Sequence, residues 1–501
     1  MPHQTYPSLS RRQILRGAAL GSAAAVIPFS EWMARSARAQ TIMTRYSTAS
    51  PEGQEMLKIY NRAIGVMRER PAGHPSSWTF QWYTHAVHSD SNKPREMAWI
   101  YACDDQYRPV AQAMWNTCMG HHGSPESFAT WHRAYVLFFE HIVREAAGTD
   151  EFTLPYWPYE LQEQRVVPAT FRMKSAADYG YLYVGNRAID QMPNINDGGS
   201  VEIGGGVLDF KCLQETKFCH FNKLLDSKPH GQIHNGVGDI RNMGAVPWAA
   251  RDPVFWVHHS QVDRIWASWN AAGGQNPTDP SFLSIQYTFA RPDGTAVLVT
   301  NEDMLDIATL GYDYQTLIPT DPIPPVEGSI PALCPGEAVA GNKYLVSETN
   351  ATVNIILGSA PATVNVNISS DGLAGGQVMQ SLAVKSAETD TRIYLRFTGM
   401  MAQTAVGTSF GVYLGLPIGA APSPDSPYYA GVLHYFNHTH MPGMDHSVEN
   451  SQAYLINITD TVQRMQRLGL ITSDISVTII PLKPSAVRGA PVIGGIEVVL
   501  Y

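Results

Sequence analysis

Histidines spaced for one face of a helix limit the folds open to this chain. His230 and His234 stand four residues apart, so on a helix both imidazoles point to one side and can hold the same metal ion. Further along, His258 and His259 precede Asp263. Neighbouring residues diverge by about 100° around a helix, so only one of this pair is expected to face the metal. The carboxylate of Asp263, one turn beyond His259, is expected to hold its imidazole in the ligating tautomer. We therefore assign His259 as the ligand and His258 as a packed neighbour.

A second set of histidines lies earlier and cannot be completed from one helix. His132 opens a predicted helix that ends near His141, and the two lie on opposite faces of it. Other segments must therefore supply the partners of His132. The candidates upstream are His85, His88, His121 and His122.

The residue composition and the hydrophobic pattern change once along the chain. Residues 41–317 are rich in Trp and His, and apolar spacing predicts helices at 56–67, 135–144 and 254–269. A Pro-rich linker is expected at 319–342. Beyond it, period-two patterns predict strands near residues 353–357, 363–368, 392–397, 410–414 and 475–480, with one helix at 460–468. The expected fold is a mainly α domain (40–318) followed by an all-β sandwich (343–501).

The N-terminus is typical of an export signal. Arg11 and Arg12 form a twin-arginine pattern, followed by a short apolar stretch at 17–29. Ala37-Arg38-Ala39 has the small-x-small form of a cleavage site. We expect residues 1–39 to be removed after twin-arginine export to the periplasm or the medium, and no membrane helix to remain.

Composition excludes one class of partner. The net charge is −9 without a basic run, which argues against nucleic acid. Five cysteines, Cys103, Cys118, Cys212, Cys219 and Cys334, leave at least one unpaired or modified. Cys212 and Cys219 are close enough to bridge, although spacing alone does not decide the pairing.

Several long motifs occur in a fixed order. They are Phe128-Ala-Thr-Trp131-His132-Arg133-Ala-Tyr135, Leu154-Pro-Tyr-Trp157, His230-x-x-x-His234 and Asp252-Pro-Val-Phe-Trp-x-His-His259-x-x-Val-Asp263-Arg264. In these the chain resembles the family of tyrosinases, catechol oxidases and molluscan haemocyanins. The resemblance is strong from Trp78 to Trp269, and the sequence near Ile493 resembles the last strand of the shielding domain in plant-type polyphenol oxidases.

The resemblance implies two copper ions inside a four-helix bundle. It assigns His85, His122 and His132 to the first copper, and His230, His234 and His259 to the second. His122 and His132 are one residue further apart than is usual in the family, which keeps His121 open as an alternative, as His88 is to His85. Many members link a cysteine to the second ligand in a Cys-x-His arrangement, but here two further residues separate Cys118 from His122.

The implied activity is the oxidation of o-diphenols to o-quinones by dioxygen. Oxidation of monophenols to o-quinones is the second activity that the family offers. The family associates monophenol hydroxylation with an Asn directly after the first ligand of the second copper and with an upstream acid. Gly231 occupies the Asn position here, whereas Asp226 is the candidate acid and Asn235 follows the second ligand. Two alternatives stay open: an o-aminophenol or other specialised phenolic oxidase, and a dioxygen carrier.

The C-terminal domain is expected to cover the copper pocket and make the enzyme latent. Phe436 is the candidate plug, and the Pro-rich linker is the expected protease-sensitive hinge. The same loop carries side chains suited to copper, because thioethers favour Cu(I) and imidazole takes either oxidation state. Copper delivery within the chain is therefore expected through His438, His440, Met441, Met444 and His446.

Overall fold

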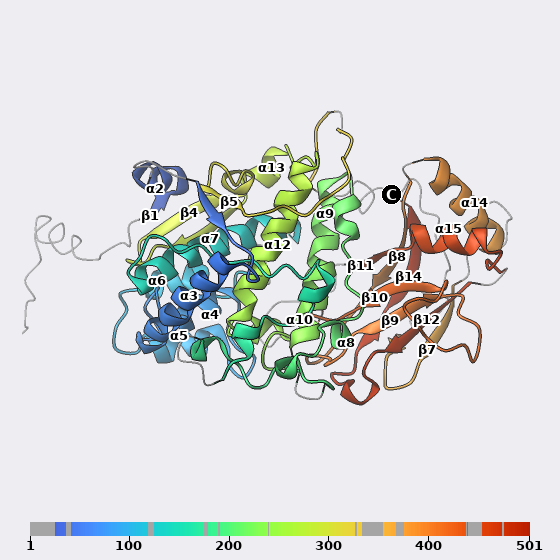
Figure 1. Ribbon diagram of the computed structural model, residues 1–501, viewed down its shortest axis with the longest axis horizontal. Helices are drawn as coiled ribbons and strands as arrows, with labels where there is room; N and C mark the ends of the chain where they lie inside the picture. The colour runs from blue at the N-terminus through green and yellow to red at the C-terminus, as the bar shows by residue number, and fades with distance from the viewer. Residues whose placement is uncertain are drawn as a thin grey trace, which may run out of the picture.

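The computed structural model describes most of the chain. The described residues are 26–36, 42–118, 125–174, 179–188, 191–238, 240–325, 328–332, 354–366, 375–389, 391–436, 438, 453–472 and 475–500. A helical part, coloured blue to yellow in Figure 1, lies beside a β-rich part in orange and red.

Long helices build the helical part, and the three predicted ones are confirmed. They are α3 (Pro51–Glu69), α7 (Phe128–Ala147) and α12 (Val254–Ala271). Ser50 caps α3 by accepting a hydrogen bond from the Gly53 N–H, and Pro51 suits the first turn because it needs no donor there. Gly148 ends α7 at φ 66°, a conformation that glycine adopts without strain.

Shorter helices complete this part. They are α4 (Trp78–His85), α5 (Lys93–Ile100), α6 (Arg108–Met114), α8 (Glu202–Gly205), α9 (Phe218–Leu225), α10 (Gln232–Val237), α11 (Val246–Ala249) and α13 (Pro280–Leu283). Between α9 and α10 the chain makes a π-type turn, η8 (Asp226–Gly231). Lys228 is extended there, as the residue before a proline prefers to be, and the turn re-aims the chain just before His230.

Two small sheets join N-terminal strands of the helical part to strands near its C-terminal end. Strand β2 (Met43–Arg45) pairs in parallel with β5 (Tyr312–Tyr314), which brings sequence-distant segments together. In the other sheet, β4 (Ala296–Thr300) lies between β3 (Gln286–Ala290) and β1 (Val26–Pro28). Strand β1 and the following helix α2 (Phe29–Ser36) belong to the segment that the sequence assigns to a removed signal.

The β-rich part has the expected two-sheet character. One sheet has the order β10-β9-β12-β7 and the other β11-β8-β14, and β6 pairs with β13. The strands are β6 (Ile355–Ile356), β7 (Ala362–Val366), β8 (Ile393–Thr398), β9 (Phe410–Leu414), β10 (Tyr429–Leu433), β11 (Tyr454–Asn457), β12 (Ile475–Pro481), β13 (Val492–Ile493) and β14 (Gly495–Leu500).

This part also contains helices. The predicted helix is α15 (Thr459–Arg467), while α14 (Gly375–Glu388) was not predicted, so the expected all-β composition needs this correction. The small and polar residues of α14 give only a weak helical periodicity in the sequence. Packing of α14 against α15 stabilises the helix in the folded protein.

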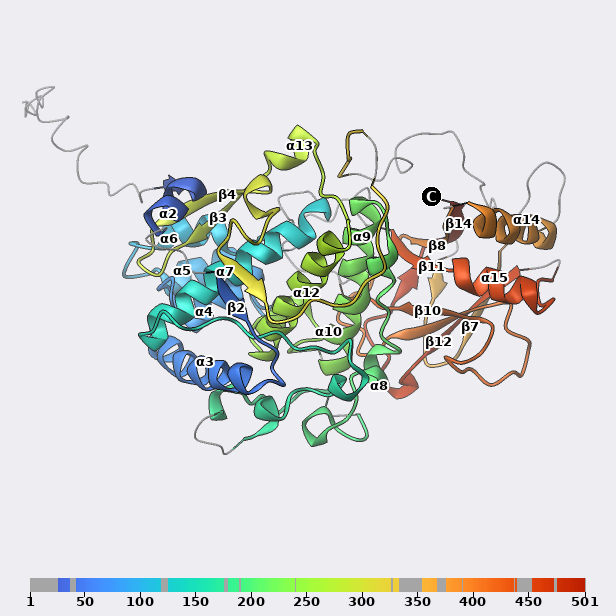
Figure 2. The same ribbon diagram turned by 45° about the horizontal axis from the view of Figure 1, so that its top comes forward.

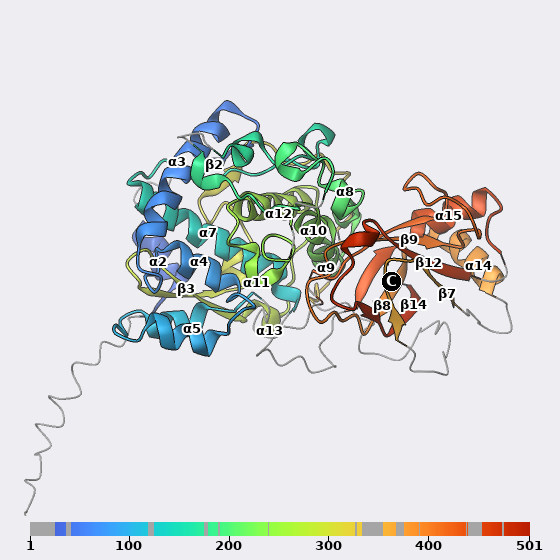
Figure 3. The ribbon, with the colours of Figure 1, turned by 90° about the horizontal axis from the view of Figure 1, so that it is seen from below.

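The two parts have separate apolar cores that meet at one border. Figures 2 and 3 show the β-rich part beside α8, α9 and α10, at the opposite end from α2. Tyr394, Phe436 and Leu455 of the β-rich part join the core of the helical part. Among the described residues, no helix combines the length and apolarity needed to cross a membrane.

Candidate metal centre

Five helical segments bring two groups of possible metal donors into the core. The first group contains His85 at the end of α4, Cys118, and His132 on α7; the second contains His230 of η8, His234 of α10, and His258 and His259 of α12. Within each group the donor atoms lie within 4.8 Å of one another, and all seven residues are buried. The sequence assigns five of these residues to the metal.

Backbone carbonyls orient four of the imidazoles. The Nδ1–H of His132 donates to Phe128 O at 2.8 Å, and that of His230 to Asp226 O at 2.7 Å. In the same way His234 donates to Met243 O at 2.7 Å and His85 to Val246 O at 3.1 Å. With Nδ1 carrying the proton, Nε2 keeps the lone pair that a metal needs.

The two groups face each other across α7 and α12. The His132 and His259 rings stack with centroids 4.4 Å apart, and the His132 centroid lies 6.0 Å from that of His230. The Nε2 atoms of His230 and His234 are buried and have no hydrogen-bond partner among the described residues. Buried polar atoms are rarely left unsatisfied, so the donor set fits a pair of metal ions with imidazole ligands.

Both residues of the His258-His259 pair belong to this environment. His258 stacks parallel to His230 at 5.4 Å and lies 4.9 Å from His234, measured between ring centroids. Neither nitrogen of either residue has a hydrogen-bond partner in the described part of the chain. The donor distances thus do not separate the two, although only His259 also stacks on a member of the first group.

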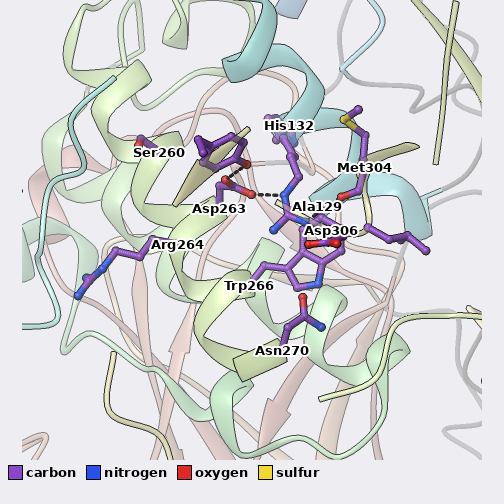
Figure 4. Close-up of polar contacts among 12 residues, drawn as sticks. Ala129, His132, Ser260, Asp263, Arg264, Trp266, Asn270, Met304 and Asp306 are labelled. Atoms are coloured by element: carbon purple, nitrogen blue, oxygen red, sulfur yellow. Dashed lines mark hydrogen bonds and ion pairs between the residues drawn. The ribbon is translucent and has the colours of Figure 1, made fainter. Parts of the chain in front are cut away.

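The expected contact between Asp263 and His259 is wrong. Asp263 Oδ1 accepts from Arg133 Nε at 2.5 Å, while its Oδ2 accepts from Tyr312, Tyr314 and Arg45 at 2.6, 2.5 and 3.1 Å. Figure 4 shows the Asp263 carboxylate directed into this polar cluster. Position i+4 places the carboxylate on a neighbouring part of the α12 surface, where two guanidinium groups attract it more strongly than a neutral imidazole.

Opposite charges keep this cluster ionised. Burial alone would raise the pKa of Asp263, but Arg133 and Arg45 hold that pKa below its usual value. Arg45 also donates to Glu140 Oε2 at 3.0 Å, and Arg133 lies 3.5 Å above the Trp266 ring. The cluster therefore joins β2, α7, α12 and β5 behind the metal-facing histidines.

The geometry of the first group favours His85 over His88. The His85 centroid lies 6.0 Å from that of His132, whereas His88 Nε2 lies 3.6 Å from Glu96 Oε1, beside Trp248. The predicted ligand His122 and its alternative His121 lie outside the described residues. Cys118 Sγ lies 3.6 Å from His132 Nε2, which places this thiol among the donors.

The two candidate catalytic residues lie beside the second group. Asp226 is largely buried, and its Oδ1 lies 3.3 Å from His230 Nδ1, the nitrogen that also donates to the Asp226 carbonyl. Asn235 Nδ2 donates to Gly231 O at 2.9 Å within its own helix. A water-holding role for Asn235 stays a prediction.

The β-rich part reaches the second group through β10 and the loop after it. The Phe436 ring stacks on His234 with centroids 3.9 Å apart and an interplanar angle of 15°. His434 Nε2–H donates to Ser227 O at 2.5 Å, and its ring occupies the space that a side chain on Gly231 would need. The sequence analysis predicted Phe436 as the plug but did not predict the contact of His434. The glycine at position 231 was the feature that could have indicated it, because a residue without a side chain leaves room for another ring.

The expected copper-delivery loop is described only in part. His440, Met441, Met444 and His446 lie outside the described residues. The His438 N–H donates to Tyr435 O at 3.0 Å, and burial lowers the pKa of its imidazole to about 4.

Burial also sets the protonation of the second group. It lowers the pKa of His234, His258 and His259 well below the usual range, and the neighbouring imidazoles lower it further. These side chains are therefore neutral at neutral pH, which is the form that binds a metal.

The disulfide between Cys212 and Cys219 that their spacing allows is not formed. Cys212 is a free, buried thiol, whereas Cys219 takes part in a disulfide. The two therefore do not bridge each other.

We expect Asp263→Ala to destabilise the protein by about 3–5 kcal/mol, because it leaves two buried guanidinium groups without their shared carboxylate. Asp105→Ala is the control, since Asp105 pairs with Arg108 at the surface and its loss should change stability by less than about 1 kcal/mol. Denaturant unfolding of both variants measures the difference. Equal stabilities would show that the buried cluster is not a main support.

We expect His85→Ala and His234→Ala each to retain one copper ion per chain after reconstitution, against two for the unaltered protein, because each variant breaks one donor group. His88→Ala should retain both ions, since His88 lies against Glu96. Metal analysis of the folded variants gives the counts. Two ions in His234→Ala, or one in His88→Ala, would contradict the assignment.

Comparison with known proteins agrees with this geometry. The family profile described as the common central domain of tyrosinase matches residues 75–196 and 201–272, and a domain of unknown function, DUF7868, matches 343–498. The chain is 30% identical over 318 residues to tyrosinase HcTyr1 of Hahella sp., covering 56% of this chain and 65% of that protein. It is 26% identical over 307 residues to polyphenol oxidase A1 of Vicia faba, covering 54% and 47%.

A solved structure extends the likeness to the β-rich part. The structure of latent apple tyrosinase matches with a TM-score of 0.59 and 20% identity, over 92% of this chain and 97% of that chain, which shows a shared fold. The chain spans about half to two thirds of the length of the relatives named above. The profile match, these relatives and the paired histidine groups together show that residues 75–272 carry a central domain of the tyrosinase and polyphenol oxidase family.

Proposed function

We propose that this protein is a copper-dependent oxidase that converts o-diphenols to o-quinones with dioxygen. The observation that carries the proposal is the pair of facing donor groups, with Nδ1 anchored on backbone carbonyls where the structure gives a partner. Bound copper would supply the electron transfer between the phenol and dioxygen. The family relatives, which are tyrosinases and polyphenol oxidases, support this reaction class.

The proposed ligand set follows the two groups. His85, His122 and His132 would hold the first ion, and His230, His234 and His259 the second. Burial keeps the imidazoles of His234 and His259 neutral, and backbone carbonyls orient those of His85, His132, His230 and His234. The aromatic rings of Phe255 and Trp131 exclude water around His259 and His132. We further propose that Asp226 acts on the second site by orienting His230.

The surroundings of Gly231 support a preference for o-diphenols. A monophenol must lose its proton, and phenolic pKa is about 10, so hydroxylation gains from a nearby base or an oriented water. No side chain extends from Gly231, and Asn235 is bonded to the backbone of its own helix. An o-diphenol needs no hydroxylation and is less affected by this lack.

We expect L-DOPA to be oxidised faster than L-tyrosine, with a lag on tyrosine. Initial rates on the copper-loaded protein test this, with oxygen uptake as the readout. Equal rates without a lag would argue that another group deprotonates the monophenol. Gly231→Asn is not a simple test in the whole protein, because its side chain would collide with His434.

We also propose that the β-rich part shields the copper pocket. Phe436 is 3% exposed and covers His234 face to face, where a flat aromatic substrate would otherwise stack. Polar contacts also join the two parts of the molecule. Glu215 of the helical part accepts hydrogen bonds through Oε1 from Tyr394 OH at 2.7 Å and from Asn457 Nδ2 at 3.3 Å, both in the β-rich part. Lys211 pairs with Asp460 across the same border at 3.0 Å.

The domain division belongs to this proposal. We propose a catalytic domain at 40–318, against which the segment Val26–Ser36 also packs, a linker at 319–342 and a shielding domain at 343–501. The separate apolar cores and the second profile match, over 343–498, support it. Export by the twin-arginine route is likewise proposed, on the strength of Arg11 and Arg12.

We expect Phe436→Ala to raise catechol oxidation severalfold without proteolysis, because it removes the ring that covers His234. Cleavage in the linker at 319–342 should raise the activity of the unaltered protein and add little to the variant. Ile418→Ala, at a fully exposed position of the β-rich part, is the control and should stay as latent as the unaltered protein.

Two outcomes would argue against this function. Unchanged activity in Phe436→Ala and after complete cleavage would contradict shielding. If the opened, copper-loaded protein bound dioxygen reversibly but left catechol untouched, a dioxygen carrier would replace the oxidase as the better proposal.

A further inference from the structure

A segment just downstream of the twin-arginine pattern is built into the helical part. Strand β1 pairs in parallel with β4, with Val26 opposite Ala296, Ile27 opposite Val297 and Pro28 opposite Leu298. Without β1, the central strand β4 would become an edge strand with unpaired backbone groups. Figure 1 shows β1 and α2 beside β4, and Figure 2 shows α2 at the same end of the molecule, far from the β-rich part.

Helix α2 adds an apolar face. Phe29, Trp32 and Met33 follow the i, i+3, i+4 spacing of one helix side, and all three pack on the core of the helical part. Phe29 and Trp32 are only 5% and 4% exposed, whereas Ser30 and Ala34 face outward. This division between a buried and an exposed face is typical of a helix that belongs to a folded domain.

The contacts of Trp32 lead toward the first donor group. Its ring stacks on Phe138 with centroids 4.5 Å apart and meets His141 edge-on at 4.8 Å. The Phe138 ring also stacks on Phe289, with ring centroids 5.1 Å apart. Phe289 in turn contacts Trp131, the residue before His132. Trp32 thus extends an aromatic row that runs along α7 to a proposed copper ligand.

Removal of this segment would uncover a large apolar surface. Cleavage after Ala39, where the small-x-small pattern lies, would release β1 and α2 together. The β4 edge and the Phe138 ring would then meet water, and exposing a buried aromatic ring is strongly unfavourable.

We propose that Val26–Ser36 is a permanent structural element of the folded protein, and that the mature chain is not cut after Ala39. The segment seals the β4 edge and supports α7 from the side opposite the copper pocket. This inference rests on packing and holds whatever substrate the enzyme oxidises.

The first test identifies the N-terminus of the exported protein. The full chain is produced in a host with twin-arginine export, and the protein recovered outside the cytoplasm is examined by intact mass and N-terminal sequencing. We expect a chain that still contains Val26–Ser36. A mature chain that begins at Gln40, with or without the excised peptide bound, would overturn the proposal.

The second test uses matched substitutions in the same helix, read on the exported protein. Trp32→Ala should lower the thermal midpoint by about 5 °C or more, because it leaves a cavity against Phe138. Ser30→Ala, on the exposed face, should change it by less than about 1 °C. Equal midpoints for the two variants would mean that the segment is not part of the mature fold.

A third comparison covers the case in which Trp32→Ala fails to accumulate. Two shortened chains are produced in the cytoplasm, one beginning before Val26 and one at Gln40. We expect the longer chain to be soluble with two copper ions and the shorter one to aggregate or unfold at lower temperature. Identical yield, copper content and thermal midpoint would refute a structural role for the segment.

Discussion

The buried carboxylate of Asp263 is the interaction on which the rest of the helical part depends. It accepts hydrogen bonds from two guanidinium groups and two phenols, which come from β2, α7 and β5. A charge taken out of water is tolerated only when it is paired and hydrogen-bonded, so these segments can pack in one arrangement. That arrangement sets α7 against α12 and brings His132 and His259 into contact.

A second constraint acts on the imidazoles themselves. Each anchored Nδ1–H needs a carbonyl at the correct place, and those carbonyls lie at two helix starts, in a π-type turn and in the loop before α11. Irregular backbone is therefore part of the second group, where the carbonyls of Asp226 and Met243 lie outside regular α-helix. The kink at Lys228 serves this purpose, and it also places Gly231 where His434 can approach from the β-rich part.

The sequence-based predictions succeeded where short-range periodicity was sufficient. Helices α3, α7 and α12 and strands β7, β8, β9 and β12 follow from local patterns of apolar residues. The prediction for Asp263 failed because spacing along α12 says which residues share a region of its surface but not what packs against them. Helix α14 was missed for a related reason, since its stability comes from α15 and not from its own composition.

The sequence by itself determined the kinds of donor, their order and their pairing on helices, because residue identity and i, i+4 spacing are local properties. It also indicated the change from a helical to a β-rich part at the Pro-rich stretch. Only the tertiary structure decided that His85 and not His88 lies with His132, that His258 lies among the donors, and that Phe436 covers His234. It likewise placed Trp32 on Phe138 within a segment that reads as a removable signal. These contacts join residues far apart in the chain, and their energies depend on which surfaces exclude water together, which no local pattern encodes.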